Sequence, residues 1–236
     1  MGSDLNAQLI ATAATRPGRC LEIGAGRGTK TYVMMCQAKR AGYNRQHTAL
    51  DLHDRKCDQN LARLHKAGIQ GVRTVSGDAC ELDAVLTSFD AMLGKPVLFD
   101  TVFIDAPCSG TGTMRRHPEI PWRLTEKDVT TELPRLQLTM LKEAAARVAA
   151  GGELIYATCS VFDEENTQVV DAFLSSLEGA DFSLAPLSEA QILQLPDFAQ
   201  AKKLVSVRQN DRGLFQSVPV NVDSYDGHFC ARLVHK

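Results

Sequence analysis

Short apolar runs alternate along this chain with longer segments in which apolar residues recur every three or four positions. The short runs, rich in β-branched residues, predict buried strands, and the longer periodic segments predict helices. Strands are expected at residues 19–23, 47–51, 71–75, 101–104, 153–157 and 228–234, and helices at residues 6–14, 31–41, 54–67 and 82–93. This alternation predicts one doubly wound, Rossmann-like α/β domain over residues 1–236, mostly parallel with an antiparallel C-terminal strand.

The second half of the chain carries two further helix patterns and then a weaker pattern. A long helix begins near Pro134 and ends at Gly151-Gly152, and its apolar face comprises Leu133, Leu136, Met140, Ala144 and Val148. Asp163 is the expected N-cap of the next helix. The buried stripe of that helix comprises Val169, Val170, Phe173, Leu174 and Leu177. From residue 179 to residue 220 the pattern weakens, and strands are expected at residues 203–207 and 214–218.

Composition narrows the class of protein. The 236 residues are 44% apolar and 23% charged, which is typical of a globular domain. No run approaches the roughly 20 apolar residues of a membrane span, and no secretory signal opens the chain. The seven cysteines form no CxxC pair and no Cys/His cluster at zinc spacing. We therefore expect no disulfide framework, no metal and a reducing, cytoplasmic location.

A glycine-rich turn follows the first predicted strand. The segment from Gly24 to Lys30 has the sequence Gly-Ala-Gly-Arg-Gly-Thr-Lys and leads into a helix, as nucleotide-cofactor loops do. Its G-x-G-x-G spacing differs from the dinucleotide motif because Thr29 stands where the last glycine would fall. The spacing favours an S-adenosylmethionine (SAM) methyltransferase over a dehydrogenase, and a plain structural turn is the alternative. The expected cofactor contacts are Gly24, Ala25, Gly26, Arg27, Gly28, Thr29 and Lys30.

Acids close the second and third predicted strands. Asp51 stands where this class of fold holds the ribose hydroxyls of its cofactor, and a helix N-cap is the alternative role. Asp78 lies in a turn from which it could meet the adenine, although Gly-Asp is also a common plain turn.

Two Cys-Ser pairs, Cys108-Ser109 and Cys159-Ser160, each follow a predicted strand. The strand at residues 101–104, which precedes Cys108, is followed directly by Asp105. Because the carboxyl ends of parallel strands share one edge, we expect Asp105 and both thiols to face one pocket. Methylation of a pyrimidine at C5 needs this set: a thiolate adds to C6, an acid acts at N3, and a base removes the C5 hydrogen. The other cysteines, Cys20, Cys36, Cys57, Cys80 and Cys230, are expected to pack as small apolar side chains.

With these motifs the chain resembles the Sun-type family of RNA cytosine-C5 methyltransferases, whose bacterial members include ribosomal RNA enzymes. The matching segments are residues 105–120, 157–166 and 227–233, with a looser match at residues 21–31. The resemblance implies that Cys159 is the nucleophile and that Cys108 helps to release the product. It also implies that Asp105 contacts the base beside the cofactor, that Pro107 lies with the substrate, and that the glycine loop, Asp51 and Asp78 bind SAM.

The resemblance also implies a substrate, which is RNA. Ribosomal RNA is the expected class, and transfer RNA is the alternative. We expect the family's N-terminal RNA-binding region to be absent from this chain, and the net charge of −2 agrees with that expectation. A local basic patch then remains for RNA contact, although a charge cluster is often only a solvated face. The patch comprises Arg115, Arg116, His117 and Arg123.

The sequence departs from the family in one motif, and three rival functions stay open. The family's first loop usually has the sequence Cys-Ala-Ala-Pro-Gly-Gly-Lys, so Lys30 is kept while Arg27 replaces a proline. A DNA cytosine-C5 methyltransferase, an amino-group methyltransferase and a SAM-fold RNA-binding module without activity are the rivals. The Thr-Cys motif opposes the first, and Ala106 with Cys108 opposes the second. We expect the chain to be a monomer.

Overall fold

A computed structural model describes residues 3–221 and 225–236, and within them a single sheet of eight strands organises the fold. The strands are β1 (Gly18–Ile23), β2 (Arg45–Asp51), β3 (Val72–Ser76), β4 (Phe99–Asp105), β5 (Val148–Thr158), β6 (Phe182–Ala185), β7 (Phe215–Ser217) and β8 (His228–His235). Their order is β3-β2-β1-β4-β5-β8-β6, with β7 also paired to β8. The first five strands are parallel and β8 is antiparallel to β5, which confirms the predicted fold class.

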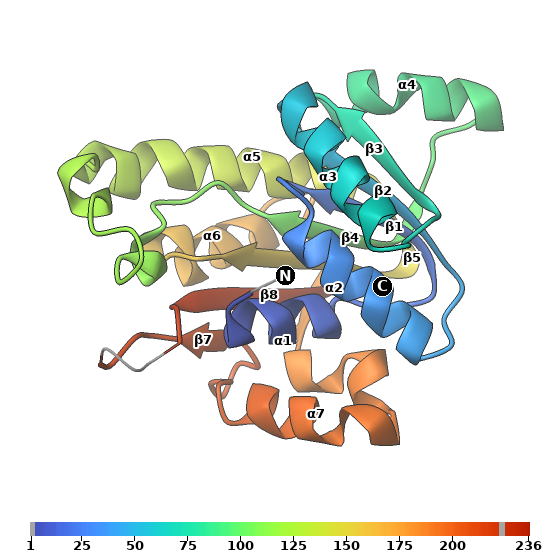
Figure 1. Ribbon diagram of the computed structural model, residues 1–236. Coiled ribbons are helices and arrows are strands. Elements are labelled where there is room, and N and C mark those ends of the chain that lie inside the picture. The colour runs from blue at the N-terminus through green and yellow to red at the C-terminus, as the bar shows by residue number, and fades with distance from the viewer. Residues whose placement is uncertain (1–2, 222–224) are drawn as a thin grey trace.

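Helices cover both faces of this sheet (Figure 1). They are α1 (Leu5–Ala13), α2 (Thr29–Arg40), α3 (Asp54–Lys66), α4 (Leu82–Leu93), α5 (Leu133–Ala145), α6 (Thr167–Leu174) and α7 (Ala199–Ser206). Helices α4, α5 and α6 share one core with the sheet, whereas α1, α2 and α7 share the other. In β4, Val102 and Ile104 belong to the first core and Phe103 to the second, as the alternation of side chains along a strand requires.

The strand order positions the functional edge. After β3 the chain returns through α4 to place β4 on the other side of β1, so the carboxyl ends of β1 and β4 meet at a topological switch point. Ligands of doubly wound sheets bind in the crevice at this point. The ends of β1, β2, β4 and β5 carry Gly24, Asp51, Asp105 and Cys159 to that edge.

The structure corrects the predicted long helix. Helix α5 ends at Ala145, and Val148 opens β5, so Gly151-Gly152 lies within a strand rather than at a helix end. Gly151 has a φ of +70°, and the pairing of β4 with β5 shifts register beside it, which is the geometry of a β-bulge. Leu136 is exposed, because the buried face of α5 comprises Gln137, Met140, Leu141, Ala144 and Ala145.

Four further expectations were wrong. Residues 203–207 were predicted as a strand but fall largely in α7, which packs against α1. Asp163 opens a short 3₁₀ turn, and α6 begins only at Thr167. Leu177 lies beyond the end of α6 and is 93% exposed. Cys36 is exposed on α2 instead of packed in a core. The strand predicted at residues 214–218 is confirmed as β7.

Candidate active site

The glycine loop after β1 has a backbone that only glycine adopts readily. Gly24, Gly26 and Gly28 have φ values of +76°, +55° and +81°. A Cβ on Gly24 would lie 2.3 Å from the carbonyl oxygen of Asp105, and one on Gly28 would lie 1.9 Å from Asn60 Oδ1. At Gly26 the nearest atom would be 3.9 Å away. The loop therefore packs tightly against β4 and α3 while Gly26 borders open space where a ligand can approach.

Asp51 ties this loop to the end of β2. Its side chain is buried and accepts hydrogen bonds from the backbone N–H groups of Gly26 (2.9 Å) and His53 (3.1 Å). Lys56 Nζ lies 3.4 Å from the same carboxylate. Asp78 lies at the end of the neighbouring strand on an exposed turn and accepts from the N–H of Cys80 (2.8 Å). The two acids thus follow the glycine loop along the sheet edge.

A buried polar network supports the same loop from below. Thr31 Oγ1 donates to Glu22 Oε2 (2.6 Å), and His47 Nε2 lies 2.8 Å from that oxygen. Asn60 Nδ2 donates to Thr31 (3.2 Å). Burial alone would lower the pKa of His47, but Cys20 and the Glu22 carboxylate raise it to about 9. A carboxylate and an imidazole are therefore paired in the core beneath the start of α2.

Lys30 and Asp105 form the central ion pair of the edge. Lys30 Nζ, from the first turn of α2, donates to Asp105 Oδ2, from the end of β4, over 2.6 Å. Burial would lower the pKa of Lys30, but the Asp105 carboxylate outweighs that effect and raises it. The pair therefore presents a fixed ammonium and a carboxylate side by side.

The two predicted thiols lie in contact. Cys108 Sγ and Cys159 Sγ are 3.3 Å apart, and the backbone N–H of Cys159 points at Cys108 Sγ (3.4 Å). The hydrogen bond from Cys108 lowers the pKa of Cys159, and Lys30 adds to this effect. The same hydrogen bond, burial and the nearby Glu165 raise the pKa of Cys108. These opposite directions favour the thiolate form at Cys159 and the thiol form at Cys108.

A fully buried carboxylate, Glu165, holds both cysteine loops. Its Oε2 accepts from the N–H of Ser109 (2.8 Å) and from Gln137 Nε2 (3.0 Å), and its Oε1 accepts from Ser160 Oγ (2.7 Å). Ser109 and Ser160 also bond to each other (3.0 Å). Gln137 in turn donates to the carbonyl of Pro107 (2.9 Å). The serine after each cysteine is therefore a positioning group.

Backbone contacts join a third segment to these loops. The N–H of Gly112 donates to the carbonyl of Cys159 (2.8 Å), and the N–H of Gly227 donates to the carbonyl of Gly112 (2.8 Å). A Cβ on Gly112 would lie 2.2 Å from the Gly227 oxygen. The segments after β4 and β5 and before β8 thus meet at a glycine that no larger residue can replace.

A cavity of about 500 Å³ opens beside this junction, and Lys30, Asp105, Cys159, Arg115, Arg116 and His228 help to line it. The arginines are partly neutralised, because Arg116 Nε donates to Asp226 (2.8 Å) and Arg115 lies 3.6 Å from the same carboxylate. His117 pairs with Glu119 (3.4 Å) and does not line this cavity. Arg123 lines a neighbouring cavity of about 740 Å³ that also reaches Cys108.

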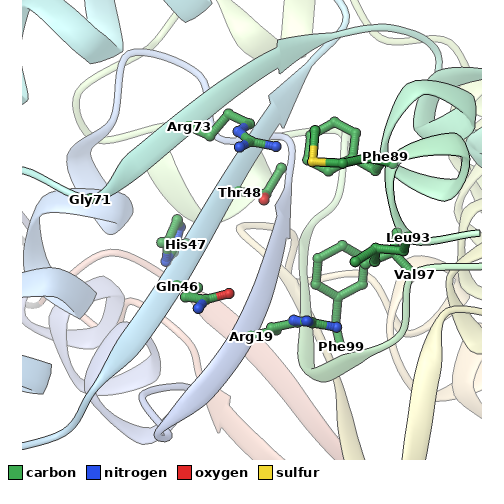
Figure 2. A pocket seen from close by; sticks show the side chains of 11 residues that line it. Arg19, Gln46, His47, Thr48, Gly71, Arg73, Phe89, Leu93, Val97 and Phe99 are labelled. Atoms are coloured by element: carbon green, nitrogen blue, oxygen red, sulfur yellow. The ribbon is translucent and has the colours of Figure 1, made fainter.

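A hollow at the opposite edge is a weaker candidate (Figure 2). It has a volume of about 280 Å³ and lies between the start of β2 and helix α4, with Arg73, Phe89, Leu93 and Phe99 among its lining residues. The Arg73 guanidinium lies 4.7 Å from the centre of the Phe89 ring. Because this hollow lies at the amino ends of the strands, it is remote from the cysteines. Among the described residues no group of three or more His, Cys, Asp or Glu could hold a metal ion, and no helix has the length and apolarity to cross a membrane.

Comparison with known proteins places the chain in a family. Residues 10–233 match the model of the 16S rRNA methyltransferase RsmB/F family. The chain belongs to the RsmB/F family. The ribosomal RNA small subunit methyltransferase B of Klebsiella pneumoniae is 32% identical over 163 residues, which are 69% of this chain and 35% of that protein. The Proteus mirabilis protein of the same name is 45% identical over 82 residues, 35% of this chain and 19% of its own length. The chain therefore matches about a third or less of these RsmB/F relatives.

Solved structures support the RsmB/F fold over the whole chain. The crystal structure of PH0851 has a TM-score of 0.76 and 25% identity, covering 99% of this chain and 46% of that chain. NSun6 from Pyrococcus horikoshii, solved with SFG, has a TM-score of 0.72 and 20% identity, covering 99% of this chain and 52% of that chain. At 20% identity, the similarity to NSun6 shows a shared fold.

Sequence reasoning missed several polar residues that the RsmB/F site contains. Glu165 and His228 lie inside the motifs that carried the family resemblance, yet nothing in their spacing assigned them a role. Asp226 and Gln137 carried no signal, because their partners lie more than 25 residues away in the chain. An acid within a loop that follows a buried strand was the one available indication of Glu165.

Proposed function

We propose that this chain transfers a methyl group from SAM to C5 of a cytosine in ribosomal RNA. The observation that carries the proposal is the 3.3 Å contact of Cys108 with Cys159. The Lys30–Asp105 ion pair lies in the cavity that Cys159 lines. C5 of cytosine is a poor nucleophile, and addition of a thiolate to C6 activates it. The membership of the RsmB/F family supports the same reaction.

The carboxyl edge of the sheet fits SAM. Gly26 leaves open space above a loop of positive-φ glycines, where backbone N–H groups at the start of α2 can approach the cofactor. Both oxygens of Asp51 already accept hydrogen bonds, but a carboxylate has about four acceptor positions, so it can also hold ribose hydroxyls. Exposed Asp78 is placed for the adenine amino group. When bound, SAM supplies the methyl group.

Cys159 is the nucleophile of the proposed reaction. Its lowered pKa, caused first by the Cys108 hydrogen bond and then by Lys30, keeps a larger fraction of thiolate at neutral pH. As its sulfur adds to C6, charge develops on the ring at O2 and N3. The Lys30 ammonium stabilises that charge, and Asp105 accepts a hydrogen bond from the N4 amino group of the base.

Cys108 acts in product release. Its raised pKa keeps it as a thiol, which donates a hydrogen bond to Cys159 Sγ. When the C6–S bond breaks, negative charge returns to the Cys159 sulfur. The Cys108 thiol is in place to stabilise that leaving group, since hydrogen bonds to a charged acceptor are the strong ones.

The RNA contacts of the proposed enzyme lie around the two cavities. Arg115 and Arg116 line the first, and Arg123 lines the second with Cys108, while Pro107 lies exposed between β4 and Cys108. With a net charge of −2 the domain supplies few phosphate contacts, so tight binding depends on other contacts. His117 extends the same patch. Ribosomal RNA is the proposed class, and transfer RNA is the alternative substrate. A cytoplasmic location agrees with seven unpaired cysteines, and a monomeric state stays a prediction.

Methylation of 16S ribosomal RNA and of bulk transfer RNA by the purified chain tests this function. The wild-type chain and the Cys36→Ala control, which changes an exposed cysteine on α2, are expected to form 5-methylcytosine, and Cys159→Ala is expected to form none. Mapping of 5-methylcytosine by bisulfite sequencing identifies the nucleotide. A chain that binds SAM by calorimetry but methylates neither RNA would instead be a binding module. Equal activity of Cys159→Ala and wild type would overturn the proposed mechanism.

A further inference from the structure

One proton of the proposed reaction has no acceptor among the residues assigned so far. After methyl transfer C5 carries both the methyl group and its original hydrogen, and release requires that this hydrogen leave as a proton. Cys108 is a protonated thiol, Lys30 is an ammonium, and the Asp105 oxygen that faces Lys30 is engaged in an ion pair. The acceptor must be a base with a free lone pair on the side of the ring where Cys159 lies, because thiol and methyl add to opposite faces.

The start of β8 brings a histidine to the cavity that Cys159 lines. Strand β8 runs antiparallel to β5, and its last paired position sets Thr158 opposite Phe229. Cys159 and His228 are the next residues beyond this pair, and there the carbonyl of Cys159 accepts from the N–H of Gly112 rather than from a residue of β8. His228 also lines the cavity that contains Cys159, Asp105 and Lys30.

The hydrogen bonds of His228 fix which ring nitrogen is free. Nδ1 lies 3.3 Å from the carbonyl oxygen of Asp226, and a carbonyl only accepts, so Nδ1 carries the ring proton. Nε2 then holds the lone pair. Within residues 3–221 and 225–236, Nε2 has no hydrogen-bond partner, and it is not among the buried polar atoms that lack one. The side chain is 6% exposed, so this nitrogen borders the cavity.

The surroundings keep the imidazole neutral. Burial lowers the pKa of His228, and the Lys30 ammonium lowers it further. Acids on three elements oppose this effect only partly: Asp4 before α1, whose carboxylate lies 3.8 Å from Nδ1, Asp226 through its carbonyl, and Asp105 on β4. The charge of the Asp226 carboxylate is taken up by the guanidinium groups that also line the cavity, Arg115 and Arg116.

We propose that His228 Nε2 is the general base that removes the C5 hydrogen of the methylated cytosine. This role rests on the proposed function. The C5–H electron pair forms the C5=C6 double bond, the C6–S bond breaks with its electron pair returning to Cys159, and the proton ends on Nε2. The products are 5-methylcytosine, a Cys159 thiolate and an imidazolium. Cys108 and His228 then divide release between them: the thiol stabilises the leaving sulfur, and the imidazole takes the proton.

A variant that keeps the polarity of the ring but accepts no proton tests the proposal. His228→Gln is compared with wild type and with His235→Gln, a control on the same strand whose Nδ1 also faces a carbonyl, that of Val148 (3.1 Å). RNA carrying tritium at cytosine C5 is supplied with SAM, and two quantities are followed: released tritium and the protein–RNA adduct that survives denaturation. SAM binding by calorimetry confirms that each variant is folded.

For His228→Gln we expect tritium release to fall by about 10²–10⁴-fold while methylated adduct accumulates. His235→Gln should match wild type. In wild type, the single-turnover rate of release should rise with pH through a value below 6.5, the ordinary pKa of histidine, because only the neutral imidazole accepts a proton. In His228→Gln the release rate should not show this rise with pH.

Release by His228→Gln at the wild-type rate would overturn the role of the histidine. A wild-type release rate that falls as the pH rises toward 7 would overturn it as well, and this second measurement needs no variant. If wild type itself forms neither adduct nor 5-methylcytosine, the proposed function fails instead, so the two failures are distinguishable.

Discussion

The two cysteine loops share a Cys-Ser pair and a place after a buried strand, yet their charges differ. Cys159 has the Lys30 ammonium nearby, and Cys108 has the Glu165 carboxylate. In their direct contact one sulfur donates and the other accepts. The comparison teaches that the dipeptide supplies a thiol in both loops, whereas the neighbouring charged groups shift the two pKa values in opposite directions.

Removal of each thiol in turn should have the largest effect on methyl transfer and should distinguish the roles of the two cysteines. Cys159→Ala is expected to lower methyl transfer by at least about 10³-fold, because it deletes the nucleophile. Cys108→Ala is expected to allow addition but to retain RNA as a covalent adduct, since the leaving sulfur loses its hydrogen-bond donor. Denaturing gels with labelled RNA separate the two outcomes. Adduct from Cys159→Ala together with inactivity and no adduct in Cys108→Ala would reverse the roles.

Loss of the carboxylate that joins the loops should be the next largest effect. Glu165→Ala leaves Ser160, Gln137 and the Ser109 N–H without their buried acceptor. Such losses destabilise a protein by about 2–4 kcal/mol, measured as the free energy of unfolding in urea. The adjacent, partly exposed Glu164 is the control, and Glu164→Ala should change that free energy by less than about 0.5 kcal/mol. A Glu165→Ala effect as small as the control would show that the serines need no acid.

Removal of one cation should reduce the contrast between the pKa values of the two thiols. The pKa of Cys159 is lowered first by Cys108 and also by Lys30, so Lys30→Met should raise it. A higher pKa lowers the thiolate fraction of Cys159 and therefore its rate of alkylation at neutral pH. Mass spectrometry of iodoacetamide-treated protein measures labelling of the Cys159 peptide against pH. Lys39→Met, at the exposed end of the same helix, should leave the profile unchanged. If the pH profile of Cys159 labelling is unchanged in both variants, Lys30 does not lower the pKa of Cys159.

The buried pair of His47 with Glu22 takes no part in the proposed reaction, and changing it should have the smallest effect. The pKa of His47 is raised to about 9, so protonated His47 stabilises the fold fully below its unfolded pKa near 6.5. That contribution is lost as the pH rises through about 9. The unfolding free energy should therefore fall between pH 7 and pH 10, and His47→Gln should reduce the fall. If the unfolding free energy has the same pH dependence in wild type and in His47→Gln, His47 is not protonated in the folded protein.

The sequence predicted the parallel strands and the edge they share because those strands are continuous apolar runs whose acids and cysteines stand at their ends. It failed where periodicity is ambiguous. Val148 continues the apolar spacing of α5 but opens β5, which then bulges at Gly151. The roles of Glu165 and Asp226 could not be predicted, because each depends on partners brought together only by the fold. His228 required the position of β8 beside the cavity that Cys159 lines, which no local pattern specifies.

The junction at Gly112 has a consequence for the substrate. Its N–H and C=O groups bind the Cys159 and Gly227 segments at 2.8 Å each, and no side chain fits between them. The loops after β4 and β5 and the segment before β8 are therefore joined through main chain beside the cavity. In the proposed reaction a stacked cytosine would have to leave its helix to enter this cavity, at an unstacking cost of a few kcal/mol that is least in single-stranded or mispaired RNA. Under the proposed function, the accessibility of the nucleotide in its RNA would then select the site of methylation.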